Sequence, residues 1–148
     1  MRFYSTISIY GQIGEYPNRS IDVIQRLSKS VGRIDILLQS IGGSIDDAFE
    51  IIDYINYLPE NRRSELRLFC LASASSASLY LVKCLNIQII ISKLFLSREH
   101  EPSFSLNEND SVYLYTREYK ECLNSSKCKV LSYIDIIKCQ NGRNIIII

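Results

Sequence analysis

The chain has 148 residues, of which 47% are hydrophobic and 22% charged, and this is enough apolar material for the core of one ordinary domain. Lys and Arg number 17 against 16 Asp and Glu, so the net charge of +1 lacks the basic excess typical of nucleic-acid-binding proteins. No apolar stretch reaches the length of a membrane span, and the N-terminus has no basic segment followed by an apolar one. We therefore expect neither a membrane protein nor a secreted one.

Apolar periodicity predicts an alternation of strands and helices along the chain. The segments expected to be strands are 6–14, 33–39, 65–71, 86–92 and 93–99. The segments expected to be helices are 20–31, 45–58, 79–85 and, with a break near 124–128, 113–137. Ser20 is a favourable N-cap for the first helix, and Pro59 stops the second.

The cysteines and the single histidine bear on metal binding and on the compartment. The 5 cysteines are an odd number without C-x-x-C spacing, which favours free thiols in a reducing compartment, so we expect a cytoplasmic protein. Because His100 is the only histidine, the chain lacks the ligand set of a zinc site. We expect no metal and no cofactor.

Strands that alternate with helices predict β-α-β units around a parallel sheet, and ligands bind such sheets beyond the carboxyl ends of the strands. Two unusual segments fall at that edge: the pair Gly42-Gly43 after the second strand, and the run of small residues at 72–78 after the third. His100 follows the last of the predicted strands at the same edge. The isoleucines at 145–148 are either a strand that pairs with another or the sign of a domain cut short.

These segments have the composition of a site for acyl transfer. A glycine pair at the start of a helix exposes backbone N–H groups that can bind an oxyanion, and a serine at a strand-to-helix junction is exposed as a nucleophile. A histidine titrates near neutral pH and can act as the general base. In the plainer interpretation, the glycines form only a turn, and the Ala and Ser residues serve helix capping and close packing.

The order of three motifs resembles the ClpP-type serine peptidases, including their phage head-maturation relatives. Those peptidases carry N-S-P-G-G-[SV] between a strand and a helix, then G-x-A-A-S, and later H-x-P. Here "QSIGGS" begins at residue 39, "LASASSAS" at 71 and "HEP" at 100, and "ISIYGQIG" at 7–14 is similar to the first strand of the shorter members.

The resemblance is strongest over 6–102 and implies a single domain over 1–148 with the ClpP/crotonase-like α/β fold. In that fold, repeated β-α-β units surround a mainly parallel sheet. The C-terminal part is shortened here, with a helical, atypical tail over 103–148.

Carried over position by position, the resemblance implies that Ser75 is the nucleophile and that His100 is its general base. It also implies that the backbone N–H groups of Gly43 and Ser76 form the oxyanion hole. The rival nucleophiles in the same run are Ser73, Ser76 and Ser78.

Several positions depart from the family's pattern. Ile41 stands in place of the proline before the glycines, which makes that turn less rigid, and Leu71 stands in place of a glycine before the nucleophile. The family's catalytic aspartate has no matching motif. Asp110 and Asp135 are candidates by residue type alone, so the acid is left unassigned.

The resemblance implies a serine endopeptidase that hydrolyses polypeptides, assembles into a homo-oligomeric ring, and works with an unfoldase ATPase or on capsid proteins. The alternative is a non-catalytic subunit of the same fold that assembles or holds a peptide without cutting it, which the missing acid favours. The acyl-CoA-handling crotonases share the fold, but their catalysis uses glutamates where this chain has Ser and His. They also need a basic cluster that binds the CoA phosphate, and this chain lacks such a cluster.

Overall fold

A computed structural model describes residues 4–99, 129–138 and 144–148. Its strands are β1 (Tyr4–Ile13), β2 (Arg33–Gly43), β3 (Leu66–Ala74), β4 (Gln88–Ile91), β5 (Leu96–Glu99), β6 (Lys129–Ser132) and β7 (Ile145–Ile147). Its helices are α1 (Ser20–Lys29), α2 (Ile45–Asn56), α3 (Glu60–Arg63), α4 (Ala77–Cys84) and α6 (Tyr133–Lys138).

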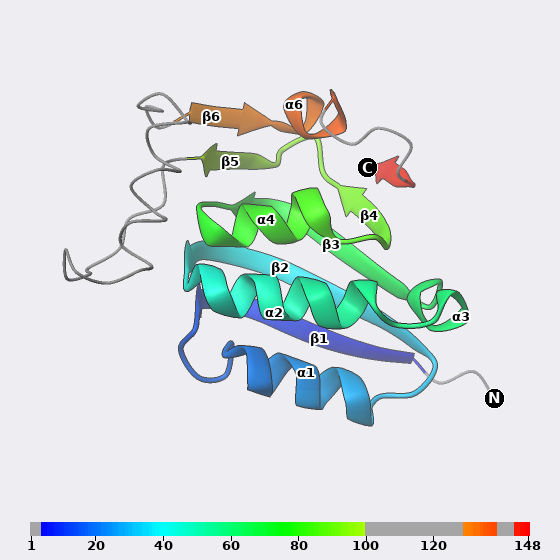
Figure 1. The fold of residues 1–148 in the computed structure, drawn as a ribbon. Coiled ribbons are helices and arrows are strands. Elements are labelled where there is room, and N and C mark those ends of the chain that lie inside the picture. The colour runs from blue at the N-terminus through cyan, green and yellow to red at the C-terminus, as the bar shows by residue number, and fades with distance from the viewer. Residues whose placement is uncertain (1–3, 100–128, 139–143) are drawn as a thin grey trace, which may run out of the picture.

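The strands β1, β2, β3, β4 and β7 lie side by side in that order, and every neighbouring pair is parallel. β5 pairs with β3 where Leu96 meets Ser73, and it pairs antiparallel with β6. Helices α1, α2 and α4 cover one face of the sheet (Figure 1). The predicted α/β architecture with a mainly parallel sheet is therefore confirmed.

The core lies between the sheet and these three helices. α2 packs between α1 and α4, and its buried side chains are Ala48, Ile51, Ile52 and Ile55. They face a layer of strand residues that are nearly all aliphatic, such as Ile34, Ile36 and Leu38 of β2. Burial of one such side chain contributes about 1.5–3 kcal/mol, so this layer holds the strand ends in fixed positions.

The structure differs from the sequence-based prediction at the end of β2, at α3, which was not expected, and at β6 and β7, which lie within the tail that was expected to be helical. β2 continues through Gly42 and Gly43, so the glycine pair belongs to the end of the strand and not to a separate turn. Residues 129–132, which were expected to be helical, form β6, because they pair with β5. The C-terminal isoleucines form β7 and pair with β4, with Ile145 opposite Ile89, which confirms the interpretation as a strand.

Side chains cover the free edge of β1, which ends the parallel sheet on one side. The guanidinium of Arg26 in α1 donates to the carbonyl of Ser8 at 3.1 Å. The side-chain amide of Asn18 donates to the carbonyl of Tyr10, and Asn18 itself is 2% exposed. These contacts occupy carbonyl groups that could otherwise pair with a strand from another chain.

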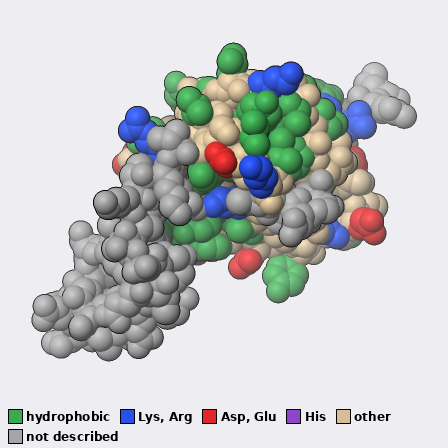
Figure 2. Space-filling model, turned by 90° about the horizontal axis from the view of Figure 1, so that it is seen from above, with side chains coloured by type: hydrophobic (Ala, Val, Ile, Leu, Met, Phe, Trp, Pro, Cys, Tyr) green, Lys and Arg blue, Asp and Glu red, His purple; other side chains and the backbone are tan. Residues whose placement is uncertain are grey.

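Exposed hydrophobic side chains gather near the opposite side of the sheet. Figure 2, seen from above, shows a group of them with Lys and Arg side chains close by. Ile134 of α6 and Ile146 and Ile147 of β7 are each exposed by more than 40%. Within residues 4–99, 129–138 and 144–148, no helix is long and apolar enough to cross a membrane.

Candidate active site

Each of the paired glycines allows a close approach of the backbone. Both have positive φ angles, +107° at Gly42 and +134° at Gly43, which side chains rarely permit. A Cβ atom added to Gly43 would lie 2.1 Å from the carbonyl oxygen of Ile13 in β1. A Cβ atom added to Gly42 would lie 2.5 Å from the Cβ of Ser76. Glycine is therefore required at both positions, because Gly43 lies against β1 and Gly42 lies against the segment between β3 and α4.

Ser76 has an unusual backbone at this junction. Its φ is 56° and its ψ is −128°, and it is the one non-glycine residue with positive φ in the part of the chain that the structure describes. Such a conformation costs on the order of 1–3 kcal/mol and is concentrated at functional sites. Ser76 is the N-cap residue of α4, yet its hydroxyl makes no capping hydrogen bond. Helix capping therefore does not account for the strained backbone of Ser76.

Ser75, by contrast, is held by hydrogen bonds on every side. Its N–H donates to the carbonyl of Ser40 at 3.0 Å, and its hydroxyl oxygen accepts from the N–H of Arg98 at 3.2 Å. Its carbonyl accepts from the hydroxyl of Ser78 at 2.7 Å. Ser78 is fully buried, so it is an unsuitable nucleophile.

The backbone N–H groups near Ser76 differ in their availability. The N–H of Ser76, an expected oxyanion donor, already donates to the carbonyl of Arg98 at 2.9 Å. The next N–H, that of Ala77, has no acceptor among the described residues. Ala77 is the first residue of α4, where helix N–H groups lack partners within the helix. An oxyanion could therefore be bound by Ala77 more readily than by Ser76.

Three residues that the sequence suggested for the site are not among the described residues beside Ser75 and Ser76. His100 and Asp110 fall outside the described residues. Asp135 lies in the first turn of α6, and its carboxylate accepts from the N–H of Ser132 at 2.8 Å and from the Ser132 hydroxyl at 3.1 Å. The hydrogen bond from the Ser132 N–H holds the pKa of Asp135 below its ordinary value. Asp135 thus serves its own helix start.

Ser40 is a residue of this site that sequence reasoning missed. It is 3% exposed and follows the buried Ile34, Ile36 and Leu38 on the same face of β2. A polar residue in a buried position of a strand is costly unless it is hydrogen-bonded. That position, two residues before Gly42, was the signal that could have identified it.

The described residues offer neither a metal cluster nor a reactive thiol near this edge. No cluster of three or more His, Cys, Asp or Glu among them could hold a metal ion. Cys70 lies in β3, and its burial raises the pKa of the thiol to about 12. A thiol with such a pKa stays protonated at neutral pH and is a poor nucleophile. The serines remain the candidate nucleophiles of this part of the structure.

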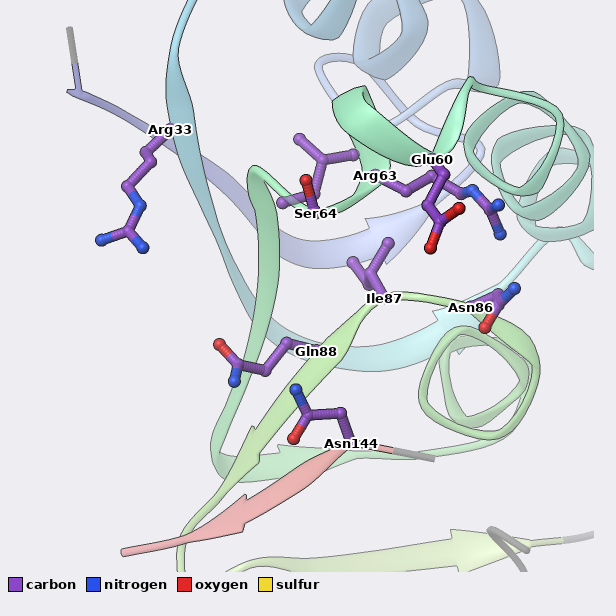
Figure 3. Close-up of a pocket in the computed structure, with 9 residues that line it drawn as sticks. Arg33, Glu60, Arg63, Ser64, Asn86, Ile87, Gln88 and Asn144 are labelled. Atoms are coloured by element: carbon purple, nitrogen blue, oxygen red, sulfur yellow. The ribbon is translucent and has the colours of Figure 1, made fainter. Parts of the chain in front are cut away.

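A hollow in the described residues lies at the amino ends of the strands, opposite the glycine pair. It is lined by residues that include Arg33, Arg63, Asn86, Gln88 and Asn144. Figure 3 shows that the guanidinium groups of Arg33 and Arg63 extend to opposite sides of it. Because these charges do not converge, the hollow has no focus for an anion.

Comparison with known proteins identifies the fold. No protein-family model matches the chain, and no curated protein sequence matches it. Among solved structures, a point mutant of ClpP1 from Listeria monocytogenes matches 97% of this chain and 90% of its own length, with a TM-score of 0.67 and 20% sequence identity. The chain therefore has the ClpP fold, as its motifs predicted.

Proposed function

We propose that the chain is a serine peptidase of the ClpP type and that Ser76 supplies the reactive hydroxyl. One observation carries this proposal: Ser76 has a strained, positive φ at the start of α4 and lies directly against Gly42. A nucleophilic serine needs a sharp junction between a strand and a helix, where its hydroxyl is presented to substrate. The ClpP fold supports a peptidase over other hydrolases.

This proposal differs from the sequence-based expectation by one residue. The resemblance favoured Ser75, with Ser76 as a rival. Three hydrogen bonds of Ser75 favour Ser76 as the nucleophile. The hydroxyl of Ser75 already accepts from the N–H of Arg98, and its backbone N–H and carbonyl are each bonded as well. The hydroxyl of Ser76 has no hydrogen-bond partner among the described residues.

In the proposed mechanism, the Ser76 hydroxyl attacks the scissile carbonyl while His100 takes its proton. The N–H groups of Gly43 and Ala77 stabilise the oxyanion of the tetrahedral intermediate. His100 then gives the proton to the leaving amine, and water hydrolyses the acyl-enzyme by the same steps. The catalytic acid stays unassigned.

The proposed substrate is a polypeptide, and the proposed assembly is a homo-oligomeric ring. A ring restricts access to the active sites, so an unfoldase ATPase would deliver folded substrates. Capsid proteins are the alternative substrates that the resemblance to phage relatives implies. Size-exclusion chromatography with light scattering measures the assembly directly.

The test is labelling with a fluorophosphonate probe, followed by mass spectrometry of the labelled peptide. Site mapping distinguishes Ser75 from Ser76 in the wild-type protein, so it does not depend on a variant that folds. We expect the phosphonate on Ser76, and we expect Ser76→Ala and His100→Ala to label much more slowly. Loss of a triad member lowers kcat by about four to six orders of magnitude.

Two outcomes would overturn parts of this proposal. A phosphonate on Ser75 would return the nucleophile to the residue that the sequence resemblance favoured. Absence of labelling in a folded, assembled wild type, together with no cleavage of unfolded casein, would favour the non-catalytic subunit. Circular dichroism on each sample establishes that it is folded.

A further inference from the structure

Three buried serine contacts connect the glycine pair to the nucleophile segment. The hydroxyl oxygen of Ser40 accepts from the N–H of Gly42 at 3.1 Å. The carbonyl oxygen of Ser40 accepts from the N–H of Ser75 and from the hydroxyl of Ser78, each at 3.0 Å. Ser40 therefore contacts both segments of the candidate site at once, the end of β2 and the junction between β3 and α4.

Ser78 completes this arrangement from the other side. Its side chain is fully buried, and its hydroxyl lies 2.7 Å from the carbonyl oxygen of Ser75 as well as 3.0 Å from that of Ser40. The single hydroxyl proton is shared between two carbonyl groups, one on β2 and one just after β3. Alanine at 78 would leave both carbonyl groups without this donor.

Hydrogen bonds between groups that are shielded from solvent are strong constraints, and the bonds of Ser40 with Gly42 and with Ser78 are buried. An apolar residue at 40 or 78 would need no hydrogen-bond partner, because Ser40 follows the buried Ile34, Ile36 and Leu38 on one face of β2 and Ser78 lies among the buried residues of α4. The two hydroxyls thus perform a task that burial alone does not require. That task is to fix Gly42 relative to Ser75, and through Ser75 the strained Ser76.

We propose that Ser40 and Ser78 are positioning residues that hold the Gly42–Gly43 segment and the Ser75–Ser76 segment in a fixed relative orientation. This inference rests on the proposed function, because the orientation matters for chemistry only if the Ser76 hydroxyl reacts beside the Gly43 amide. Neither residue touches the reacting atoms. Ser40 and Ser78 instead set the distance and the angle between the nucleophile and the oxyanion donors. The rate of acyl transfer depends steeply on both.

The test compares two substitutions of the same shape at Ser40. Ser40→Thr keeps the hydroxyl and Ser40→Val lacks it, so any steric cost of the added methyl group is common to both. The first readout is hydrogen–deuterium exchange in the peptide that contains Gly42, and the second is the rate of fluorophosphonate labelling. Ser78→Ala is measured in the same way, and Ser97→Ala is the control, because Ser97 is 1% exposed and its hydroxyl has no partner.

We expect exchange at Gly42 to be about three- to tenfold faster in Ser40→Val than in Ser40→Thr, because one buried hydrogen bond is lost. We expect labelling of Ser40→Val and Ser78→Ala to slow about 10- to 100-fold, with Ser97→Ala unchanged. Equal exchange and equal labelling of the Thr and Val variants would overturn the inference. If the wild type is not labelled, the proposed function fails. In that case the exchange rates alone test the positioning role, and equal exchange at Gly42 in Ser40→Val and Ser40→Thr would overturn it.

Discussion

Gly42 lies so close to Ser76 that a Cβ atom added to the glycine would be 2.5 Å from the Cβ and 3.0 Å from the hydroxyl oxygen of the serine. The same atom would be 2.8 Å from the carbonyl oxygen of Ser75. Real Cβ atoms do not approach backbone this closely, so the strand end of β2 and the start of α4 fit together only without a side chain at 42.

Gly42→Ala is therefore expected to destabilise the fold and to displace Ser76. The positive φ and the overpacking each cost about 1–3 kcal/mol, and the two costs add. Gly11→Ala is the matched control, because Gly11 has a φ of +91° but open space around its added Cβ. Urea denaturation measures both variants, and an equal loss of stability in the two would show that the contact with Ser76 is unimportant.

The ion pair between Asp35 of β2 and Arg67 of β3 provides a second prediction. Two hydrogen bonds of 2.8 and 2.9 Å join them, and the Asp35 side chain is 5% exposed while that of Arg67 is 28% exposed. Asp35→Ala is expected to cost about 2–4 kcal/mol, because it leaves the guanidinium partly buried without a partner. The double variant Asp35→Leu/Arg67→Met should recover much of that loss, since apolar pairs often replace buried ion pairs.

Glu65→Ala is the control for this pair. Glu65 meets Arg62 at 3.7 Å and is 39% exposed, so its removal is expected to cost less than about 1 kcal/mol. Urea midpoints of the four proteins at pH 7 measure these differences. A loss in Asp35→Ala as small as that in Glu65→Ala would contradict the prediction.

The pH dependence of stability is expected to include a contribution from Asp47, which joins the starts of α1 and α2. Burial alone would raise its pKa, but the hydrogen bond from the Ser20 amide, at 2.7 Å, and one with Ser44 lower the pKa below the ordinary 3.8. A depressed pKa stabilises the fold above about pH 3.8, and this stabilisation is lost as the pH falls through the folded-state value.

Asp47→Asn should therefore be less stable than wild type at pH 7, and the difference should shrink as the pH falls below about 3.8. Asp46→Asn is the matched control, because Asp46 lies in the same helical turn with an exposed side chain. Urea midpoints from pH 3 to 7 measure both. A difference between Asp47→Asn and wild type that stays constant with pH would argue against this contribution.

The sequence was sufficient to predict the helices and strands that are defined by the local spacing of apolar residues. Alternation of apolar residues identified β1, and the spacing after Gly43 identified α2, because each segment buries one face. It failed at 129–132, where β6 forms through pairing with β5, a contact between distant segments. Local spacing does not record such pairing.

The candidate site was predictable to the level of segments and not of atoms. Residue type alone indicated that Gly42 and Gly43 permit a close approach, but not that Ile13 and Ser76 are the neighbours. Ser75 and Ser76 are chemically identical, so only the backbone distinguishes the serine held by Arg98 from the one with positive φ.

The last prediction concerns the free edge of β1. Arg26 donates to the carbonyl of Ser8 and also, at 2.9 Å, to that of Pro17, while Asn18 donates to that of Tyr10. Without these side chains, β1 would present unpaired carbonyl groups along an edge where Tyr10 is 69% exposed. Such an edge recruits strands from other molecules.

Arg26→Ala combined with Asn18→Ala should therefore increase aggregation on mild heating more than it lowers the urea midpoint. Arg62→Ala is the control, because Arg62 also donates to two carbonyl groups, those of Gly32 and Ser30, but not at a sheet edge. Light scattering during a temperature ramp, together with thioflavin fluorescence, measures the aggregation. If both variants aggregate in proportion to their loss of stability, the side chains stabilise the fold without protecting the edge.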